Sequence, residues 1–466
     1  MSGSRLFITY TGGALAVLAY SYILIGALYP RPDVLILALP FILMAAVLAY
    51  TQPILGLFFV LLLSPIKTSG DEVLLLAKLL GILTLLVVLL QRIVKRESIR
   101  WTGIEAPMTL TALGMSISFI RTTNYTTVFY SLLSVISLYA LLLLCYQLVE
   151  DQADLKKLAL MFMVSGVYPI VQALLEWGQG PDPNRTYTRV SGTFTIPTGL
   201  GGFLIPVVIL ALALAFYPRL SRLERILVLV VFGGGMLALV LTLSRGALVG
   251  ALSGIFIVYL LLGQQLKNRL LTNLAILAMM AGAIWSAWPA IKGRVVTPLV
   301  DYVAGGASVM TVQQRADEFS LVIPMTLDYH FMGTGIGNYS DAVMRYRVLY
   351  NIPDLPTVPH NILLYFFGMV GIIGALGFVS VVVWLAFRII LSYRLMRSSP
   401  HEVSYYVYIG AVASLIGYLP FLITHSGLFS NEMWLATAFL LISIRLGTNL
   451  ILYGEGRDQK ELAKIN

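Results

Sequence analysis

Long apolar runs separated by short polar loops fill almost the whole chain. A membrane-spanning helix needs about 20 mostly apolar residues, and fourteen runs approach that length. The predicted spans are 7–28, 33–49, 52–65, 72–91, 105–120, 128–148, 156–176, 197–217, 226–243, 246–263, 270–288, 360–387, 404–423 and 431–452. Because 52–65 is short and closely follows its neighbour, twelve is the alternative count. The pattern predicts an all-α polytopic membrane protein with about 14 transmembrane helices.

Composition supports this class. Of the 466 residues, 58% are hydrophobic and 11% are charged, whereas soluble domains average about 25% charged residues. These proportions exclude a soluble enzyme and a disordered scaffold. The single cysteine, Cys145, lies within an apolar run and cannot form an intrachain disulfide.

The net charge of +9 becomes informative when it is divided between the two sides of the membrane. Short loops on one side carry Arg92, Lys95, Arg96, Arg100, Lys156, Lys157, Arg219, Arg222, Arg225, Lys267, Arg269, Arg388, Arg394 and Arg397. Positive loops face the cytoplasm, so we expect both termini to be cytoplasmic. The smaller basic set on the outer side consists mostly of arginine.

One outer loop is long enough to divide the chain into three parts. We expect residues 1–288 to form N-terminal transmembrane helices, 289–359 a helical outer loop, and 360–466 C-terminal transmembrane helices with a cytoplasmic tail. Within the loop, 311–329 has helical spacing, with Pro324 as the expected kink or end. The glycine-rich segment 333–339 predicts a turn, since it lacks the strand that precedes a dinucleotide fingerprint. Ser340 is the expected cap of the helix that follows.

A lone arginine interrupts the apolar stretch 226–264. As one helix this stretch would be roughly 58 Å long, about twice the thickness of the hydrocarbon core. The chain must therefore turn near 244–246, which places Arg245 at the outer mouth of a helical hairpin. Arg245 either extends to lipid headgroups or binds phosphate oxygens in a bidentate manner.

His360 begins the next apolar run, in the sequence T-V-P-H-N-I-L-L-Y. With Thr357 as the cap and Pro359 in the first turn, the imidazole lies at an outer helix N-terminus. The positive end of a helix keeps the ring neutral and able to accept a proton. The alternative is an interfacial histidine bonded to loop backbone.

Other outer residues are weaker candidates. Arg315 lies on the loop helix beside Asp317 and Glu318, which point apart and do not form a carboxylate pair. His425 and Glu432 flank the last outer loop. Because no cluster of metal ligands is evident, we expect no metal and no cofactor.

Five segments taken together carry a family resemblance. They are R-V-S-G-T-F at 189–194, S-R-G at 244–246, an arginine in the long outer loop, H-F-M-G-T-G-I-G-N-Y at 330–339 and H-N-I-L-L-Y at 360–365. The set, over about 185–375, resembles the O-antigen ligase and O-antigen polymerase superfamily, polytopic bacterial glycosyltransferases of the GT-C type. Phe331 departs from the proline that members often have there, and members often have about twelve spans.

The resemblance implies transfer of a glycan from undecaprenyl diphosphate to a sugar hydroxyl, either on lipid A–core or on another lipid-linked glycan. Arg189, Arg245 and Arg315 would bind the diphosphate, and His360 would orient or deprotonate the acceptor. Further cavity residues would be Ser244, Asn361, His330 and His425. The chemistry would be inverting and metal-independent, at the periplasmic face of the bacterial inner membrane, with membrane lipids and no nucleic acid as partners.

Two other classes of function stay open at this point. A carrier or flippase for lipid-linked oligosaccharide would place ionisable groups inside the membrane, where Lys78 is the main example. An envelope assembly protein would use the long loop to dock a partner. Within the transferase class, ligase, polymerase and protein O-glycosylating activity are all compatible with the sequence, with a slight preference for the first two.

Overall fold

The structure is a computed structural model that describes residues 51–66, 72–180, 189–266, 270–297, 300, 310–352, 355–425 and 431–454. The predicted spans 7–28 and 33–49 and both chain termini lie outside the described residues. The count of twelve or fourteen spans and the location of the termini therefore stay predictions.

All regular elements in the described parts of the chain are helical. They are α3 (Pro53–Leu63), α4 (Glu72–Val94), α5 (Glu105–Ile117), the 3₁₀ turn η1 (Ser118–Ile120), α6 (Tyr125–Leu148), α7 (Gln152–Gly178), α8 (Pro197–Ala215), α9 (Arg222–Leu241), α10 (Arg245–Leu266), α11 (Leu270–Ser286), α12 (Trp288–Ile291), the π-helix η2 (Lys292–Val296), α14 (Met310–Ser320), α15 (Val322–Asp328), α16 (Tyr339–Leu349), the π-helix η3 (Leu364–Val370), α17 (Ile372–Arg397), α18 (Val403–Thr424) and α19 (Asn431–Gly454).

Eight helices in these ranges, α6 to α10 and α17 to α19, are long and apolar enough to cross a membrane. The protein is thus a multi-pass membrane protein, helical throughout the regular elements of its described ranges. Three other predicted spans form shorter helices: α3 has 11 residues, α5 has 13 and α11 has 17. In α5 the helix tightens into the 3₁₀ turn η1 before the predicted end at residue 120.

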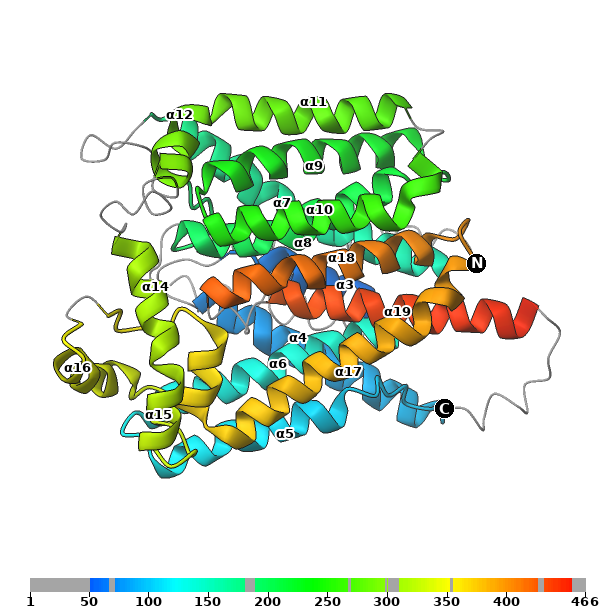
Figure 1. Ribbon diagram of the computed structural model, residues 1–466. Helices are drawn as coiled ribbons and strands as arrows, with labels where there is room; N and C mark the ends of the chain where they lie inside the picture. Colours follow the sequence, from blue (N-terminus) through cyan, green and yellow to red (C-terminus); the bar gives the residue numbers. More distant parts are fainter. Residues whose placement is uncertain are drawn as a thin grey trace, which may run out of the picture.

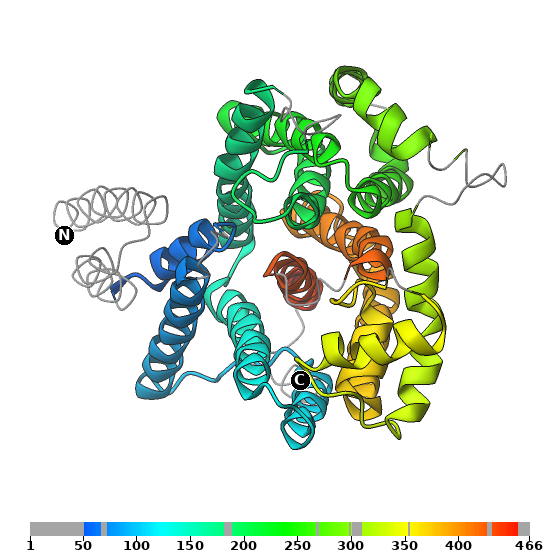
Figure 2. The ribbon, with the colours of Figure 1, turned by 90° about the vertical axis from the view of Figure 1, so that its left-hand side faces the viewer.

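The long helices run side by side and surround α19 (Figures 1 and 2). Helix α19 contacts α6, α7, α8, α17 and α18. Its Arg445 donates hydrogen bonds to the carbonyls of Tyr146 and Val149, and its guanidinium lies 4.3 Å from the Tyr146 ring centre. Helix α19 therefore holds the end of α6 in place.

A stripe of glycines brings α10 against α18. Gly246, Gly250 and Gly254 are spaced four residues apart on one face of α10. A Cβ at Gly250 would collide with the carbonyl oxygen of Gly417, and one at Gly246 would collide with Thr424. Small residues at this spacing let two membrane helices approach closely. The contact holds the start of α10, with Arg245, beside the end of α18.

Helices α14 and α15 run across the ends of the long helices (Figure 1). The predicted helix 311–329 is broken at Leu321, and the prediction of a break at Pro324 is wrong. Pro324 instead lies in the first turn of α15, where its missing N–H leaves no helical hydrogen bond unmade. Large apolar side chains on α14–α15 are exposed at four-residue spacing: Phe319, Ile323 and Leu327. This pattern is typical of a helix at a membrane surface.

The predicted continuous span 360–387 is wrong, because the helix is interrupted at Gly371. The backbone N–H of Thr334 donates to the Gly368 carbonyl (2.9 Å), and the N–H of Ile372 donates to Phe331 (2.7 Å). Gly371 has φ = 94°, and a Cβ there would lie 2.6 Å from the Met332 carbonyl. The loop after α15 thus takes hydrogen bonds that a continuous helix would have made internally, which separates η3 from α17.

Ion pairs join several loops at the opposite end of the bundle. Glu150 pairs with Arg92 (3.2 Å) and Arg100 (3.1 Å), and Lys156 pairs with Glu224 (2.8 Å). These partners come from the loops that the charge distribution assigned to the cytoplasm. Part of the positive charge there is therefore used to hold loop to loop.

Candidate functional site

A buried carboxylate lies between two of the predicted site residues. Glu318 of α14 accepts a hydrogen bond from Arg315 Nη1 at its Oε2 (3.0 Å). Its Oε1 lies 3.1 Å from His360 Nδ1 and also accepts the His360 backbone N–H (3.2 Å). The structure thus joins Arg315, Glu318 and His360 into one chain of contacts, although His360 is 42 positions away from Glu318 in the sequence.

The three side chains differ in exposure in a way that separates their roles. Glu318 has no exposed surface, whereas Arg315 is 33% exposed and His360 is 31% exposed. A substrate could therefore touch the outer two but not the carboxylate between them. When Nδ1 donates its proton to a carboxylate, Nε2 keeps its lone pair and is available as a base.

Burial and charge set the protonation of this group. Burial raises the pKa of Glu318 to about 7, against the opposing effect of the Arg315 cation. Burial also lowers the pKa of Arg315, and the positive charge of Arg245 lowers it further. Arg245 therefore acts electrostatically on Arg315, which connects the start of α10 with α14.

His360 lies directly before a capped helix start. Asn361 is fully buried, and its Oδ1 accepts the backbone N–H of Leu364 (2.7 Å). The helical residues begin at Ile362, so the prediction of Thr357 as the cap is wrong and Asn361 takes that part. The cap holds His360 beside the positive end of the helix, a place that favours anions and neutral imidazole.

Arg189 packs onto the turn that precedes Arg245. Its Nε donates to the Thr242 carbonyl (3.0 Å), and the next residue, Val190, donates to Leu241 (3.2 Å). Helix α10 begins at Arg245, directly after the buried Ser244. The predicted turn between α9 and α10 is confirmed, and it brings Arg189 next to the start of α10.

A glutamate fixes the loop that carries Arg189. Glu176, near the end of α7, accepts the backbone N–H groups of Ser191 (2.8 Å) and Gly192 (2.9 Å). Thr193 Oγ1 donates to the Pro65 carbonyl (2.6 Å). The loop is therefore held from both sides, so that Arg189 is presented from a fixed backbone.

The two remaining predicted histidines lie in different surroundings. His425 ends α18, with its ring centre 5.1 Å from that of Phe421, close to the start of α10 that packs on Thr424. His330 is exposed on the turn after α15 and has φ = 51°. In the ranges that the structure describes, no contact links His330 to the other predicted site residues.

The sequence of this region matches a known family. Residues 226–379 match the family model described as O-antigen ligase. Residues 226–379 form an O-antigen ligase family domain. The match includes Arg245, Arg315, Glu318 and His360, and it implies a glycan-transferring enzyme of bacterial membranes that acts on lipid-linked glycans. A search of curated proteins found no match.

Glu318 is the residue of this O-antigen ligase domain that the sequence pattern does not single out. The sequence predicts that Glu318 and its neighbour Asp317 point apart, which is consistent with their different burial. The spacing between Glu318 and Arg315 does predict a contact, because residues three positions apart on a helix are neighbours. The pairing of Glu318 with His360 had no signal in the sequence, since it depends on how η3 packs on α15.

The glycine-rich loop of the domain is a structural connector. Gly333, Gly335 and Gly337 all have positive φ. The backbone N–H groups of Thr334 and Gly335 donate to the carbonyls of Gly368 and Met369. These donors are therefore not available to cradle a phosphate, in agreement with the predicted turn.

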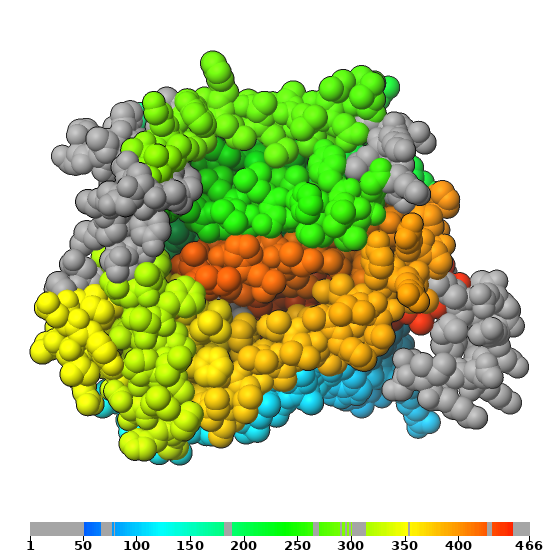
Figure 3. Space-filling model, in the orientation of Figure 1, coloured from blue at the N-terminus to red at the C-terminus, as the bar shows by residue number. Residues whose placement is uncertain are grey.

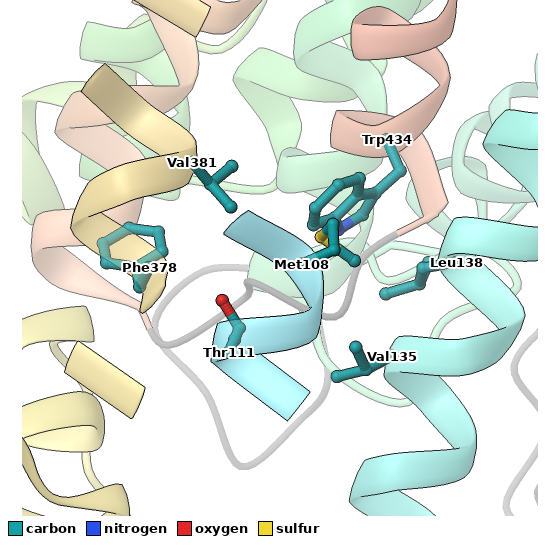
Figure 4. Close-up of a pocket in the computed structure, with 7 residues that line it drawn as sticks. All are labelled: Met108, Thr111, Val135, Leu138, Phe378, Val381 and Trp434. Carbon is teal, nitrogen blue, oxygen red and sulfur yellow. The ribbon is translucent and has the colours of Figure 1, made fainter. Parts of the chain in front are cut away.

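A small internal gap lies near the bundle centre, between α5, α6, α17 and α19 (Figure 4). It measures about 10 Å³ and is lined by Met108, Thr111, Val135, Leu138, Phe378, Val381 and Trp434. This is roughly the space that one water molecule needs, so the gap is too small to hold a substrate. Among the described residues, no group of three or more His, Cys, Asp or Glu side chains is placed to hold a metal ion.

Proposed function

We propose that the protein transfers a glycan from undecaprenyl diphosphate to an acceptor sugar hydroxyl at the periplasmic face of the bacterial inner membrane. It would act as an O-antigen ligase on lipid A–core, or as a closely related O-antigen or exopolysaccharide polymerase. The chain of contacts through Arg315, Glu318 and His360, within the O-antigen ligase domain, is the observation that carries this proposal.

In the proposed reaction, the acceptor oxygen attacks the anomeric carbon of the donor sugar. The acceptor proton goes to His360 Nε2 while the bond between the anomeric carbon and the phosphate oxygen breaks. Undecaprenyl diphosphate leaves with that electron pair, and the sugar configuration inverts. His360 is the general base, a role that contributes typically 10²- to 10⁴-fold to a rate.

Arginines receive the charge of the leaving group. Arg315 is partly exposed beside His360, and Arg245 is near enough to influence its pKa. Arg189 is held on the turn before Arg245. Guanidinium groups bind phosphate oxygens in a bidentate manner and stabilise growing negative charge, so no metal is needed for that step.

Glu318 acts in this scheme as a positioning residue. Its carboxylate accepts a hydrogen bond from Nδ1–H of His360. This bond keeps the imidazole lone pair on Nε2 and stabilises the imidazolium that forms. The same carboxylate accepts a hydrogen bond from the Arg315 guanidinium, so it also fixes the distance between the base, His360, and the phosphate-binding cation, Arg315. The buried carboxylate therefore sets the geometry of both partners without touching the substrate.

The polyprenyl chain has a path along the membrane face of the bundle. Helix α17 packs on α5, while α18 packs on α10 and α8. A furrow separates α17 from α18, with α19 at its floor, and α14–α15 lie across one end of it (Figure 3). We place the lipid tail in this furrow, with its diphosphate at the end occupied by α14. The proposed overall plan is GT-C-like, with both termini in the cytoplasm.

A reconstituted transfer assay tests the proposed function. Purified protein in proteoliposomes is given a lipid-linked glycan, with lipid A–core present or absent, and the products are resolved by mass. Polymer growth without core indicates a polymerase, and transfer only to core indicates a ligase. We expect His360→Ala to lose at least about 100-fold in rate, and the exposed cytoplasmic-side His401→Ala to match the wild type. Wild-type rates in His360→Ala would contradict the proposal.

The carrier alternative is tested separately in sealed vesicles. Lys78, the main charge within a predicted span, donates a hydrogen bond to Ser134 (2.8 Å) and so helps to hold α4 against α6. Net movement of the lipid-linked donor across the bilayer, without joining of glycans, would support the carrier instead.

A further inference from the structure

A polar groove opens beside the candidate site. It has a volume of about 460 Å³ and lies between the α5–α6 turn, the loop before α16 and the first turns of α16. Arg121, Thr123, Tyr329, Asn338, Asp341 and Arg345 contribute to its lining. Sites for small ligands usually measure roughly 300–1,000 Å³, so the groove is large enough for a ligand.

The groove has a fixed floor. Asn338 Nδ2 donates to the carbonyls of Arg121 (2.9 Å) and Thr334 (3.2 Å). Its Oδ1 accepts the backbone N–H (3.1 Å) and the hydroxyl (3.0 Å) of Thr123. One amide thus ties the α5–α6 turn to the loop before α16, although the two are more than 200 residues apart in the sequence. The groove is built before any ligand arrives, which lowers the cost of binding.

Charged groups in the groove keep unused binding capacity. Arg121 donates one hydrogen bond, from Nη1 to the Tyr329 carbonyl (3.3 Å), out of five N–H donors in a guanidinium. Arg345 makes no hydrogen bond or ion pair within the described ranges, and it does not pair with Asp341 one turn earlier on α16. Two cations and one carboxylate are therefore presented side by side with hydroxyl groups.

This set of groups fits an acidic oligosaccharide. Guanidinium groups bind carboxylate or phosphate substituents in a bidentate manner. Carboxylate and hydroxyl side chains exchange hydrogen bonds with sugar hydroxyls. The excess of cations favours a glycan that carries negative charge over a neutral one.

The loop before α16 links the groove to the candidate site. Tyr339 follows Asn338, begins α16 and is buried. Burial raises the pKa of Tyr339, and the negative charge of Glu318, the carboxylate that contacts His360, raises it further. The loop before α16 also hydrogen-bonds to η3, the helical segment that follows His360.

We propose that this groove binds an acidic glycan segment, with sugars bearing carboxylate or phosphate groups, and holds it for reaction at His360. The inference rests on the proposed function, since the bound segment is part of the donor or acceptor glycan. Arg121 and Arg345 supply the charge that selects it.

Direct binding tests the groove without requiring catalysis. The full-length protein in nanodiscs is titrated with trigalacturonic acid as the acidic probe and maltotriose as the neutral one, by calorimetry at low and high salt. We expect the acidic probe to bind more tightly than the neutral one. In the double variant Arg121→Gln/Arg345→Gln, affinity for the acidic probe should fall at least about tenfold. High salt should weaken its binding to the wild type.

The control is Lys292→Gln, which removes an exposed cation in η2, on the predicted outer side but outside the groove lining. It should bind both probes as the wild type does. Equal binding of the acidic probe by the double variant and the wild type, or equal binding of both probes by the wild type, would overturn the inference. Because His360→Ala should still bind the acidic probe, failure of transfer and failure of the groove are distinguishable.

Transfer kinetics then identify which glycan occupies the groove. If KM for the acceptor alone is higher in the double variant, the acceptor glycan lies in the groove. If KM for the donor alone is higher, the donor glycan lies in the groove. An unchanged KM for both substrates when they are acidic would contradict the role in transfer.

Discussion

At the scale of single residues, the site depends on a carboxylate that no substrate can reach. Glu318 is fully buried, while its partners Arg315 and His360 are each about one-third exposed. Removing one partner of a buried ionic contact leaves an uncompensated polar group, which costs about 3–5 kcal/mol. Glu318 therefore has a structural role as well as the proposed role in positioning His360. An experiment on Glu318 has to distinguish the two roles.

A conservative substitution with a pH profile makes that separation. The pKa of Glu318 is raised to about 7, so the carboxylate form predominates above this pH and is lost as the pH falls through it. We expect the wild-type transfer rate to decline below pH 7. Glu318→Gln should be about 10- to 100-fold slower, and its rate should fall at a different pH from that of the wild type, because glutamine does not titrate and only protonation of the base His360 remains.

The measurement is the rate of transfer between pH 5.5 and 8.5, with the fold checked by thermal melting at each pH. A merely structural role would lower the rate of Glu318→Gln at every pH but leave the pH at which the rate falls unchanged. That outcome would contradict positioning of His360 by Glu318.

The candidate site was partly readable from the sequence at this scale. Arg245 and His360 stood out because few charges interrupt the apolar runs. The contact of Glu318 with His360 could not be foreseen, since it joins two elements that are distant in the chain. The predicted cap at Thr357 is wrong because Thr357 and Pro359 form as good a local start signal as Asn361 does.

At the scale of elements, tertiary contacts override local patterns. The run 360–387 is continuous in hydropathy, yet the loop after α15 accepts and donates backbone hydrogen bonds that divide η3 from α17. The positive φ at Gly371 makes the division possible. A sequence pattern reports apolar length but not the partner that interrupts a helix.

Gly371→Ala should therefore destabilise the protein. A Cβ would lie 2.6 Å from the Met332 carbonyl carbon and oxygen, at a φ that L-residues avoid. We expect a loss of more than about 1 kcal/mol and a lower thermal midpoint in detergent. Gly282→Ala is the matched control, because it lies inside α11 and a Cβ there meets no atom within 4 Å. Equal midpoints for the two variants would show that the break at Gly371 is unimportant.

At the scale of the whole molecule, the hydropathy pattern predicts the class of protein but not how its helices are arranged. The apolar runs predicted a helical membrane protein, and the eight long helices confirm that class. The central position of α19 and the furrow between α17 and α18 depend on how the helices pack on one another (Figures 2 and 3). The site itself is assembled from α10, α14 and the start of η3, which the sequence separates widely.

Cysteine labelling tests the predicted orientation of the molecule. The only native cysteine, Cys145, is fully buried and should not react. With the outer membrane permeabilised, an impermeant maleimide should label Lys292→Cys in intact cells. It should label Lys157→Cys, which replaces an exposed lysine near the start of α7, only after the inner membrane is opened. The reverse pattern would contradict the assignment of the site to the periplasmic face.

The most direct test of the central claim is a double-mutant cycle on the contact between Glu318 and His360. Single-turnover transfer rates are measured for wild type, His360→Ala, Glu318→Gln and the double variant, with donor binding checked in each. If the two residues act as one unit, the double variant should be no slower than His360→Ala alone. Losses that multiply, or wild-type transfer by His360→Ala, would contradict the account.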